Sequence, residues 1–167
     1  MKSLYLDDAS STQVHPLTVK AMGSFFSEQY GNPSSVHIFG ENARKVIDRV
    51  RKEIAAEIRC KPWEIIFTSG VTEANNLAFI GLTKANKNKN KKKIIVSALE
   101  HSSIIEICNH LRTQGYKIVK IPVNSEGIID YASLEKEIDA QTLLVSVMHV
   151  NNVLGTIQDI SRIGAIC

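Results

Sequence analysis

The sequence predicts an α/β fold in which helices flank a mainly parallel sheet. Short apolar runs alternate with segments of helical periodicity along the chain, a pattern typical of parallel strands joined by crossover helices. The run at residues 143–147 is apolar except for one serine, as expected of a strand covered on both faces. No apolar run approaches the roughly 20 residues needed to span a bilayer. The 167 residues are therefore expected to fold around a globular core.

Helices are predicted where apolar residues recur every three or four positions. The segments with this spacing are residues 16–30, 41–58, 73–82 and 102–113. Asp130 and Asp159 are expected to cap two further helices, since aspartate accepts hydrogen bonds from the free N–H groups of a first turn. Gly115 is the expected stop of the helix at residues 102–113.

Strands are predicted at short apolar runs bounded by turn residues. These runs are residues 65–67, 94–96, 117–123 and 143–147. Because a helix lies between successive strands, we expect the strands to be parallel, with their carboxyl ends at one edge of the sheet.

The composition is that of a globular protein with one unusual segment. Hydrophobic residues make up 44% and charged residues 22% of the chain, and the formal net charge is +3. Six lysines lie within residues 84–93, and the other 14 basic residues are outnumbered by 17 acidic ones. We expect a solvated surface loop here. It contains no aromatic residue on which bases could stack, so no nucleic-acid partner is expected.

Three cysteines, Cys60, Cys108 and Cys167, form no CxxC pair. With no apolar leader after Met1, we expect a reduced, cytoplasmic protein without a membrane partner, although an organelle address stays open. Cys60 and Cys108 are expected to be buried thiols rather than nucleophiles. The five histidines lack metal-ligand spacing, so we expect no metal site.

Residues 65–76, IIFTSGVTEANN, are the most informative stretch. A predicted strand ends in small residues and a helix begins at once, which directs free backbone N–H groups and the helix dipole at one point. Gly70 permits close approach of a ligand, and the Thr72 hydroxyl can add a hydrogen bond. This geometry suits a phosphate, although neither nucleotide-binding glycine signature is present. A turn merely capped by threonine is an equally good interpretation.

Two other predicted strands also end in polar residues. Glu100 and His101 follow the strand at residues 94–96, and Asn151 and Asn152 follow the strand at residues 143–147. Taken singly, a histidine here can be a helix cap and the asparagines can shape a turn. Three polar strand ends on one edge of a sheet are a stronger indication of a ligand site.

Five ordered sequence blocks resemble the N-terminal part of the NifS/IscS-type cysteine desulfurases, which are class V pyridoxal-phosphate enzymes. The blocks are residues 5–9, 30–40, 67–76, 100–101 and 146–155. The resemblance implies the large domain of a fold-type I enzyme. Residues 1–40 would form its N-terminal segment and residues 41–167 its α/β part.

The resemblance also implies roles for individual residues. Pyridoxal phosphate (PLP) would be the cofactor, with its phosphate on Thr72 and the Val71 backbone. His101 would stack on the cofactor ring and act as the catalytic proton carrier. Asn152 would bind both the ring oxygen and the substrate, and Asn32 would contribute to substrate binding at the mouth of the site.

The implied activity is the conversion of L-cysteine to L-alanine with transfer of sulfur to an enzyme cysteine as a persulfide. The implied partners are a second copy in a homodimer and an iron–sulfur scaffold or other sulfur acceptor. In the family, the Schiff-base lysine and the acceptor cysteine lie further along than residue 167. We therefore expect a truncated or split chain, without the C-terminal portion and inactive alone, that a C-terminal chain could complement.

Two alternatives remain open at this point. The chain could be a non-catalytic domain that binds PLP or another protein, or it could belong to a selenocysteine lyase or another class V PLP enzyme.

Overall fold

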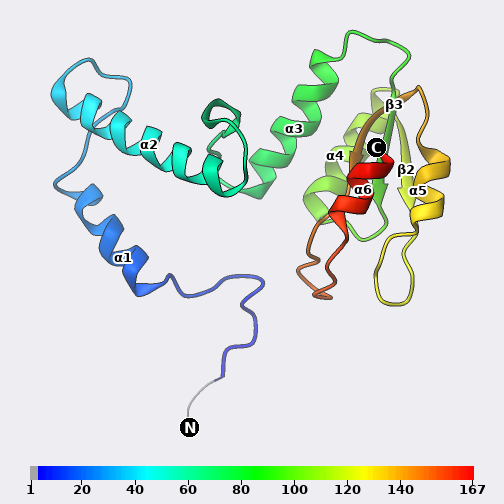
Figure 1. Ribbon diagram of the computed structural model, residues 1–167, viewed down its shortest axis with the longest axis horizontal. Coiled ribbons are helices and arrows are strands. Elements are labelled where there is room, and N and C mark those ends of the chain that lie inside the picture. The colour runs from blue at the N-terminus through cyan, green and yellow to red at the C-terminus, as the bar shows by residue number, and fades with distance from the viewer. Residues whose placement is uncertain (1–3) are drawn as a thin grey trace. The chain divides into compact units, whose positions relative to one another are not determined.

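The computed structural model describes residues 4–167, which group into two compact units, one ending at Phe67 and the other spanning Thr68–Cys167 (Figure 1). The boundary at residue 40 that the resemblance implies stays a prediction. The assignment of residues 1–167 to one large domain stays a prediction.

In the described part of the first unit, residues 4–67, every regular element is a helix. These are α1 (Pro16–Gly23), the 3-10 turn η1 (Ser24–Phe26), α2 (Ile38–Glu57) and the 3-10 turn η2 (Pro62–Glu64). The prediction of one helix over residues 16–30 is wrong beyond Gly23. Glycine and serine are weak helix formers, and the Ser24 carbonyl accepts hydrogen bonds from the N–H groups of Glu28 and Gln29, which close a turn.

Apolar side chains of the first unit are largely exposed. Phe26 is 79% and Trp63 74% exposed, whereas Ala55 of α2 is buried. The predicted strand at residues 65–67 is also wrong, because this segment has no regular secondary structure. A strand requires a neighbour for its backbone groups, and no strand among residues 4–167 pairs with this run. A local apolar pattern cannot reveal that absence.

The second unit is built on a three-stranded parallel sheet. Its strands are β1 (Lys93–Ser97), β2 (Lys117–Ile121) and β3 (Thr142–Ser146), in the order β2-β1-β3. The three predicted strands in this region are confirmed, each within two residues at either end. The predicted α/β fold class with a parallel sheet is therefore confirmed.

Four helices accompany this sheet: α3 (Val71–Ala85), α4 (Ser102–Thr113), α5 (Tyr131–Glu137) and α6 (Ile160–Ile166). Asp130 and Asp159 cap α5 and α6 through their carboxylates, as predicted. Gly115 follows α4 with φ +84°, a left-handed conformation in which glycine is unstrained. The predicted stop is confirmed.

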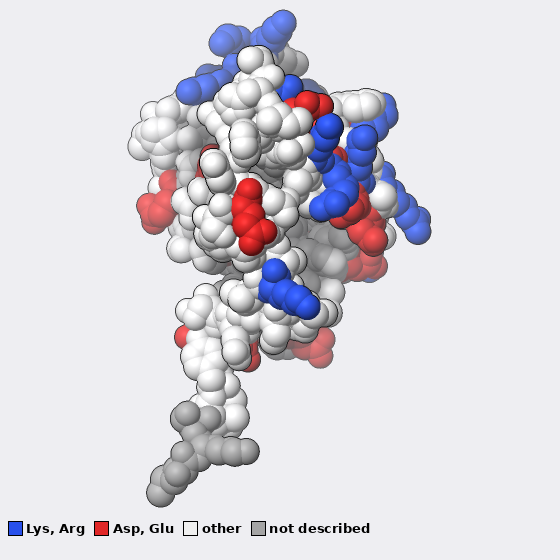
Figure 2. Space-filling model, turned by 90° about the vertical axis from the view of Figure 1, so that its left-hand side faces the viewer, with Lys and Arg blue, Asp and Glu red and all other residues white. Residues whose placement is uncertain are grey.

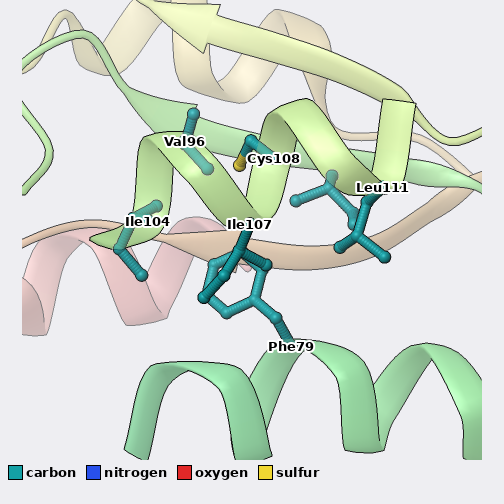
Figure 3. Packing of buried hydrophobic residues seen from close by; sticks show 7 residues of the cluster. Phe79, Val96, Ile104, Ile107, Cys108 and Leu111 are labelled. Atoms are coloured by element: carbon teal, nitrogen blue, oxygen red, sulfur yellow. The ribbon is translucent and has the colours of Figure 1, made fainter. Parts of the chain in front are cut away.

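The two faces of the sheet carry separate hydrophobic clusters, because successive side chains of a strand point to opposite faces. Ile94 and Val96 of β1 pack with Phe79 of α3 and with the buried face of α4. Figure 3 shows Phe79 reaching from α3 towards Ile107 of α4. On the opposite face, a second cluster is formed by Ile95, Ile121, Ile129, Leu134 and Ile163.

The lysine-rich segment is not a uniform loop. Lys84 lies in α3, and Lys93 begins β1 with a side chain only 5% exposed. The four lysines between them lie in an exposed turn ordered by asparagines: the Asn86 amide donates to the Lys91 carbonyl at 2.7 Å. Figure 2 shows basic side chains projecting from the end where this turn lies in Figure 1. The expectation of one solvated loop therefore holds for these four but is wrong for Lys93.

Within the described residues, no helix combines the length and apolar character needed to cross a membrane.

Candidate functional site

Two hydrogen bonds tie the carboxyl end of β1 to that of β3. The Glu100 carboxylate accepts from the Met148 N–H at 2.8 Å, and the Asn151 amide donates to the Leu99 carbonyl at 3.2 Å. Burial raises the pKa of the Glu100 carboxyl, and its bonds from the Met148 and Ser97 N–H groups oppose that rise. The two predicted strand ends therefore lie side by side on one edge of the sheet.

The N-terminus of α3 is open to a ligand. Gly70 is the N-cap residue, so no side chain closes the first turn, and the N–H groups of a first helical turn have no intrahelical acceptors. A Cβ added at Gly70 would meet no atom within 4 Å. Thr72 lies in this turn and is exposed. These donors, together with the helix dipole, suit an anion.

Glu73 secures the segment that leads into this helix. Its carboxylate accepts from the Ser69 N–H at 2.6 Å and from the Ser69 hydroxyl at 2.7 Å. These bonds hold the pKa of Glu73 below its usual value, so the group stays ionised at neutral pH. The Glu73 carboxylate therefore bonds to Ser69, the residue before the N-cap.

His101 is the N-cap residue of α4. Its Nδ1 accepts from the Ser103 N–H at 3.2 Å and lies 2.9 Å from the Ser103 hydroxyl. The Asn75 amide of α3 donates to the same hydroxyl at 2.9 Å. A chain of hydrogen bonds therefore runs from α3 to the histidine ring.

Thr72 and His101 line one open cavity of about 330 Å³. Its wall also contains Asn76 of α3 and Ser103, Glu106 and His110 of α4. The structure thus places Thr72, the residue predicted to bind the phosphate, and His101, the predicted catalytic residue, at one cavity.

The other predicted site residues are less closely associated with this cavity. Val71 is exposed at the first position of α3. Asn152 is exposed, whereas the neighbouring Asn151 makes the hydrogen bonds of the turn. Asn32 belongs to the first unit, where its side chain accepts from the Ser34 N–H at 2.9 Å. The binding roles of Val71, Asn152 and Asn32 stay predictions.

Sequence reasoning missed Asn75 and Ser103, because 28 positions separate them and nothing in the local pattern pairs them. Of the thiols, Cys108 is buried as predicted, and burial raises its pKa, as for a thiol that is not poised to react. Cys60 is only partly buried, so the expectation of a buried thiol there is wrong. It follows the end of α2, where the chain turns towards solvent.

The second unit and its cavity define an α/β protein with a candidate anion site at the carboxyl edge of a parallel sheet. Comparison with protein families then gives the particular family: the chain belongs to the aminotransferase class-V family, whose model matches residues 4–167. Members of this family depend on pyridoxal phosphate. The predicted family is confirmed.

Similar proteins are named as cysteine desulfurases. Cysteine desulfurase IscS of Rickettsia prowazekii is 44% identical over 165 residues, which cover 98% of this chain and 40% of the relative. IscS 1 of Archaeoglobus fulgidus is 44% identical over 97% of this chain and 42% of its own. The mitochondrial cysteine desulfurase of Candida maltosa is 43% identical over 99% of this chain and 34% of its own. The chain thus spans about 40% of the length of the curated relatives it matches.

Solved structures agree with this assignment. A NifS-like protein superposes with a TM-score of 0.92 at 34% identity, covering 96% of this chain and 44% of that one. SspA in complex with cysteine has the same TM-score at 35% identity, covering 98% of this chain and 47% of its own. The expected fold, that of the fold-type I PLP enzymes, is confirmed.

The residues present fit the phosphate and ring of PLP. The first turn of α3 offers uncapped N–H groups and an exposed threonine hydroxyl, and the space beside Gly70 is open. His101 lines the same cavity and presents an aromatic ring. Both kinds of contact that this cofactor needs, to an anion and to a planar ring, are therefore available.

Proposed function

We propose that the chain provides the phosphate- and ring-binding part of a cysteine desulfurase active site. The observation that carries this proposal is that Thr72, in the open first turn of α3, and His101, at the start of α4, line one cavity. Named relatives over 40% identical to the chain support the activity.

The residues take the following roles in this proposal. The Val71 N–H and the Thr72 hydroxyl bind the cofactor phosphate. His101 packs its ring against the cofactor ring and carries protons, and Asn152 binds the ring oxygen. When bound, PLP supplies an electron sink for the substrate. The protein residues hold and orient the reacting groups and move the protons.

The overall reaction balances without an added oxidant. L-Cysteine and a protein thiol give L-alanine and a protein persulfide, since the sulfur atom passes from the substrate carbon to the thiol and a proton replaces it on carbon. Cysteine as the substrate is supported by the structure described as SspA in complex with cysteine. Asn32 and Asn152 are the proposed substrate contacts.

The wider setting belongs to the same proposal. We infer a homodimer, a sulfur acceptor such as an iron–sulfur scaffold, and a cytoplasmic location. The three cysteines of residues 4–167 are free thiols, which supports a reducing compartment.

Cofactor binding is tested on the 167-residue chain by equilibrium dialysis with PLP and, separately, with inorganic phosphate. Thr72→Val removes the hydroxyl while preserving the shape of the side chain, and we expect it to weaken binding of both by roughly ten-fold to 150-fold, as for the loss of a hydrogen bond to a charged group. Thr113→Val makes the same change at the carboxyl end of α4, where no anion is expected, and should bind like the wild type. Equal affinities for all three proteins would contradict the proposed phosphate site.

Activity is tested in a chimera in which residues 1–167 replace the matched 165 residues of the Rickettsia prowazekii relative. We expect this protein to bind PLP and to form alanine from L-cysteine, and His101→Ala should abolish alanine formation while the fold is retained. A folded chimera that binds PLP but acts only on selenocysteine would support a lyase instead. A folded chimera without PLP binding would overturn the proposal.

A further inference from the structure

Asn75, Ser103 and His101 form a continuous hydrogen-bond chain at the wall of the cavity. The Asn75 Nδ2 group donates to Ser103 Oγ at 2.9 Å, and Ser103 Oγ lies 2.9 Å from His101 Nδ1. The backbone N–H of Ser103 donates to the same ring nitrogen at 3.2 Å. Asn75 and Ser103 are partly buried, whereas His101 is exposed, so water is partly excluded from the Asn75–Ser103 bond but reaches the histidine ring.

The chemistry of these groups fixes the direction of every bond. A backbone N–H can only donate, so His101 Nδ1 must accept and cannot carry a proton in the neutral ring. The Ser103 hydroxyl is then the donor of the 2.9 Å contact, and it shares the single lone pair of Nδ1 with the backbone N–H. Its oxygen is left with lone pairs, which the Asn75 amide satisfies.

We propose that Asn75 and Ser103 are positioning residues that hold neutral His101 as the tautomer protonated at Nε2. In the part of the chain that the structure describes, no hydrogen bond joins Nε2 to another group, although His101 lines the cavity. The ring nitrogen available to a ligand is therefore a proton donor.

This inference rests on the proposed function only for its catalytic consequence. If His101 serves a PLP site, the network determines that the neutral ring presents N–H rather than a lone pair. The residues come from two helices, α3 and α4, which also pack through Phe79 and Ile107. The helix that carries Thr72 thereby also fixes the orientation of the histidine ring.

The test is the ¹⁵N spectrum of histidine side chains in the 167-residue chain at a pH of about 8.5, where free imidazoles are neutral. The ¹⁵N shifts and two-bond couplings distinguish the two tautomers, and the signal missing in His101→Asn assigns the residue. We expect the Nε2–H form to dominate in the wild type. Ser103→Ala should lower the ratio of Nε2–H to Nδ1–H by roughly two-fold to ten-fold, the range that one hydrogen bond supplies. Ser103→Thr should restore it.

Two further variants sharpen the result. Asn75→Asp replaces the donor with an acceptor, so the Ser103 hydroxyl turns towards position 75 and presents a lone pair to Nδ1. We expect this variant to favour Nδ1–H more than Ser103→Ala does. Ser102→Ala changes the neighbouring serine, which makes none of these bonds, and should leave the ratio unchanged.

The inference is overturned if the wild-type ring is mainly Nδ1–H, or if folded Ser103→Ala and Asn75→Asp proteins keep the wild-type ratio. The outcome is independent of the proposed function. A chain with the expected tautomer shifts but no affinity for PLP would disprove the function and leave the hydrogen-bond network established.

Discussion

The Lys93 ammonium group, on a side chain only 5% exposed, donates a 2.6 Å hydrogen bond to the Asp139 carboxylate. It also donates to the Glu137 carbonyl at 2.8 Å. These contacts attach the start of the central strand β1 to the last residue of α5 and to the turn that leads into β3. A buried ammonium without an acceptor is strongly unfavourable, so this pair constrains how the sheet assembles.

Asp139→Asn is expected to lower stability at neutral pH, because it removes the nearer of the two carboxylates that compensate a buried lysine and leaves only Glu137, whose carboxylate is 3.9 Å from the ammonium. The hydrogen bond from Lys93 lowers the pKa of Asp139 in the folded protein. The ionised carboxylate therefore stabilises the fold at pH values above about 4, the usual carboxyl pKa. This stabilisation is lost as the pH falls through the lowered pKa of the folded protein. Urea midpoints measured between about pH 7 and pH 2.5 should therefore converge for wild type and variant on acidification.

A matched control is Glu53→Gln, which alters the exposed pair of Arg49 and Glu53 at 3.7 Å. Exposed pairs contribute little, so its urea midpoints should follow those of the wild type at every pH. Parallel wild-type and Asp139→Asn curves down to pH 2.5 would show that Asp139 does not stabilise the fold through its charge.

Glu100→Gln should leave stability unchanged or raise it at pH 7. Burial raises the pKa of this carboxyl, so the folded protein holds the proton more strongly than the unfolded chain. The wild type therefore loses stability as the pH rises from the pKa of the unfolded chain to the higher pKa of the folded protein. Glutamine still accepts from the Met148 N–H. Any advantage in urea midpoint at pH 7 should shrink near pH 4. Glu100→Ala lacks the acceptor and should be less stable than Glu100→Gln throughout. The reverse order of these two variants would contradict this account.

Local periodicity predicted α4 at its observed bounds, because Ile104 and Leu111 fall on one buried face and Gly115 supplies the left-handed stop. Such signals lie within the segment itself. Long-range pairings leave no comparable trace: Lys93 and Asp139 are 46 positions apart, and Asn75 and Ser103 are 28 apart. From the sequence, Lys93 was therefore predicted to lie in the solvated loop with the other lysines.

The candidate site shows the same division. Thr72 and His101 could be singled out because each follows a predicted strand, where α/β proteins place ligand-binding groups, and the structure places both at one cavity. The roles of Asn151 and Asn152 could not be separated by residue type, since the two are adjacent and chemically identical. Only the geometry of the turn after β3 distinguishes them.

Leu111→Ala should destabilise the second unit by about 2–5 kcal/mol, the range for removing a large side chain from a core. Leu111 is fully buried in the cluster between α4 and the sheet. Leu77→Ala, at a position 48% exposed on α3, should change the unfolding free energy by less than about 1 kcal/mol. Urea denaturation followed by circular dichroism measures both. Equal losses would mean that this cluster does not stabilise the fold as its burial indicates.

Asn151→Ala is expected to lower stability, whereas Asn152→Ala is expected to weaken cofactor binding. The Asn151 side chain accepts from the Val153 N–H at 2.9 Å and the Leu154 N–H at 2.8 Å, and donates to the Leu99 carbonyl. Its removal should lower the unfolding free energy by about 1–3 kcal/mol, because it leaves these groups without partners.

Asn152 is exposed and makes none of these bonds, so Asn152→Ala should unfold like the wild type. Under the proposed function, Asn152→Ala alone should weaken PLP binding without loss of stability. If Asn152→Ala instead unfolds earlier and binds PLP normally, the assignment of the ring-binding role to Asn152 is wrong.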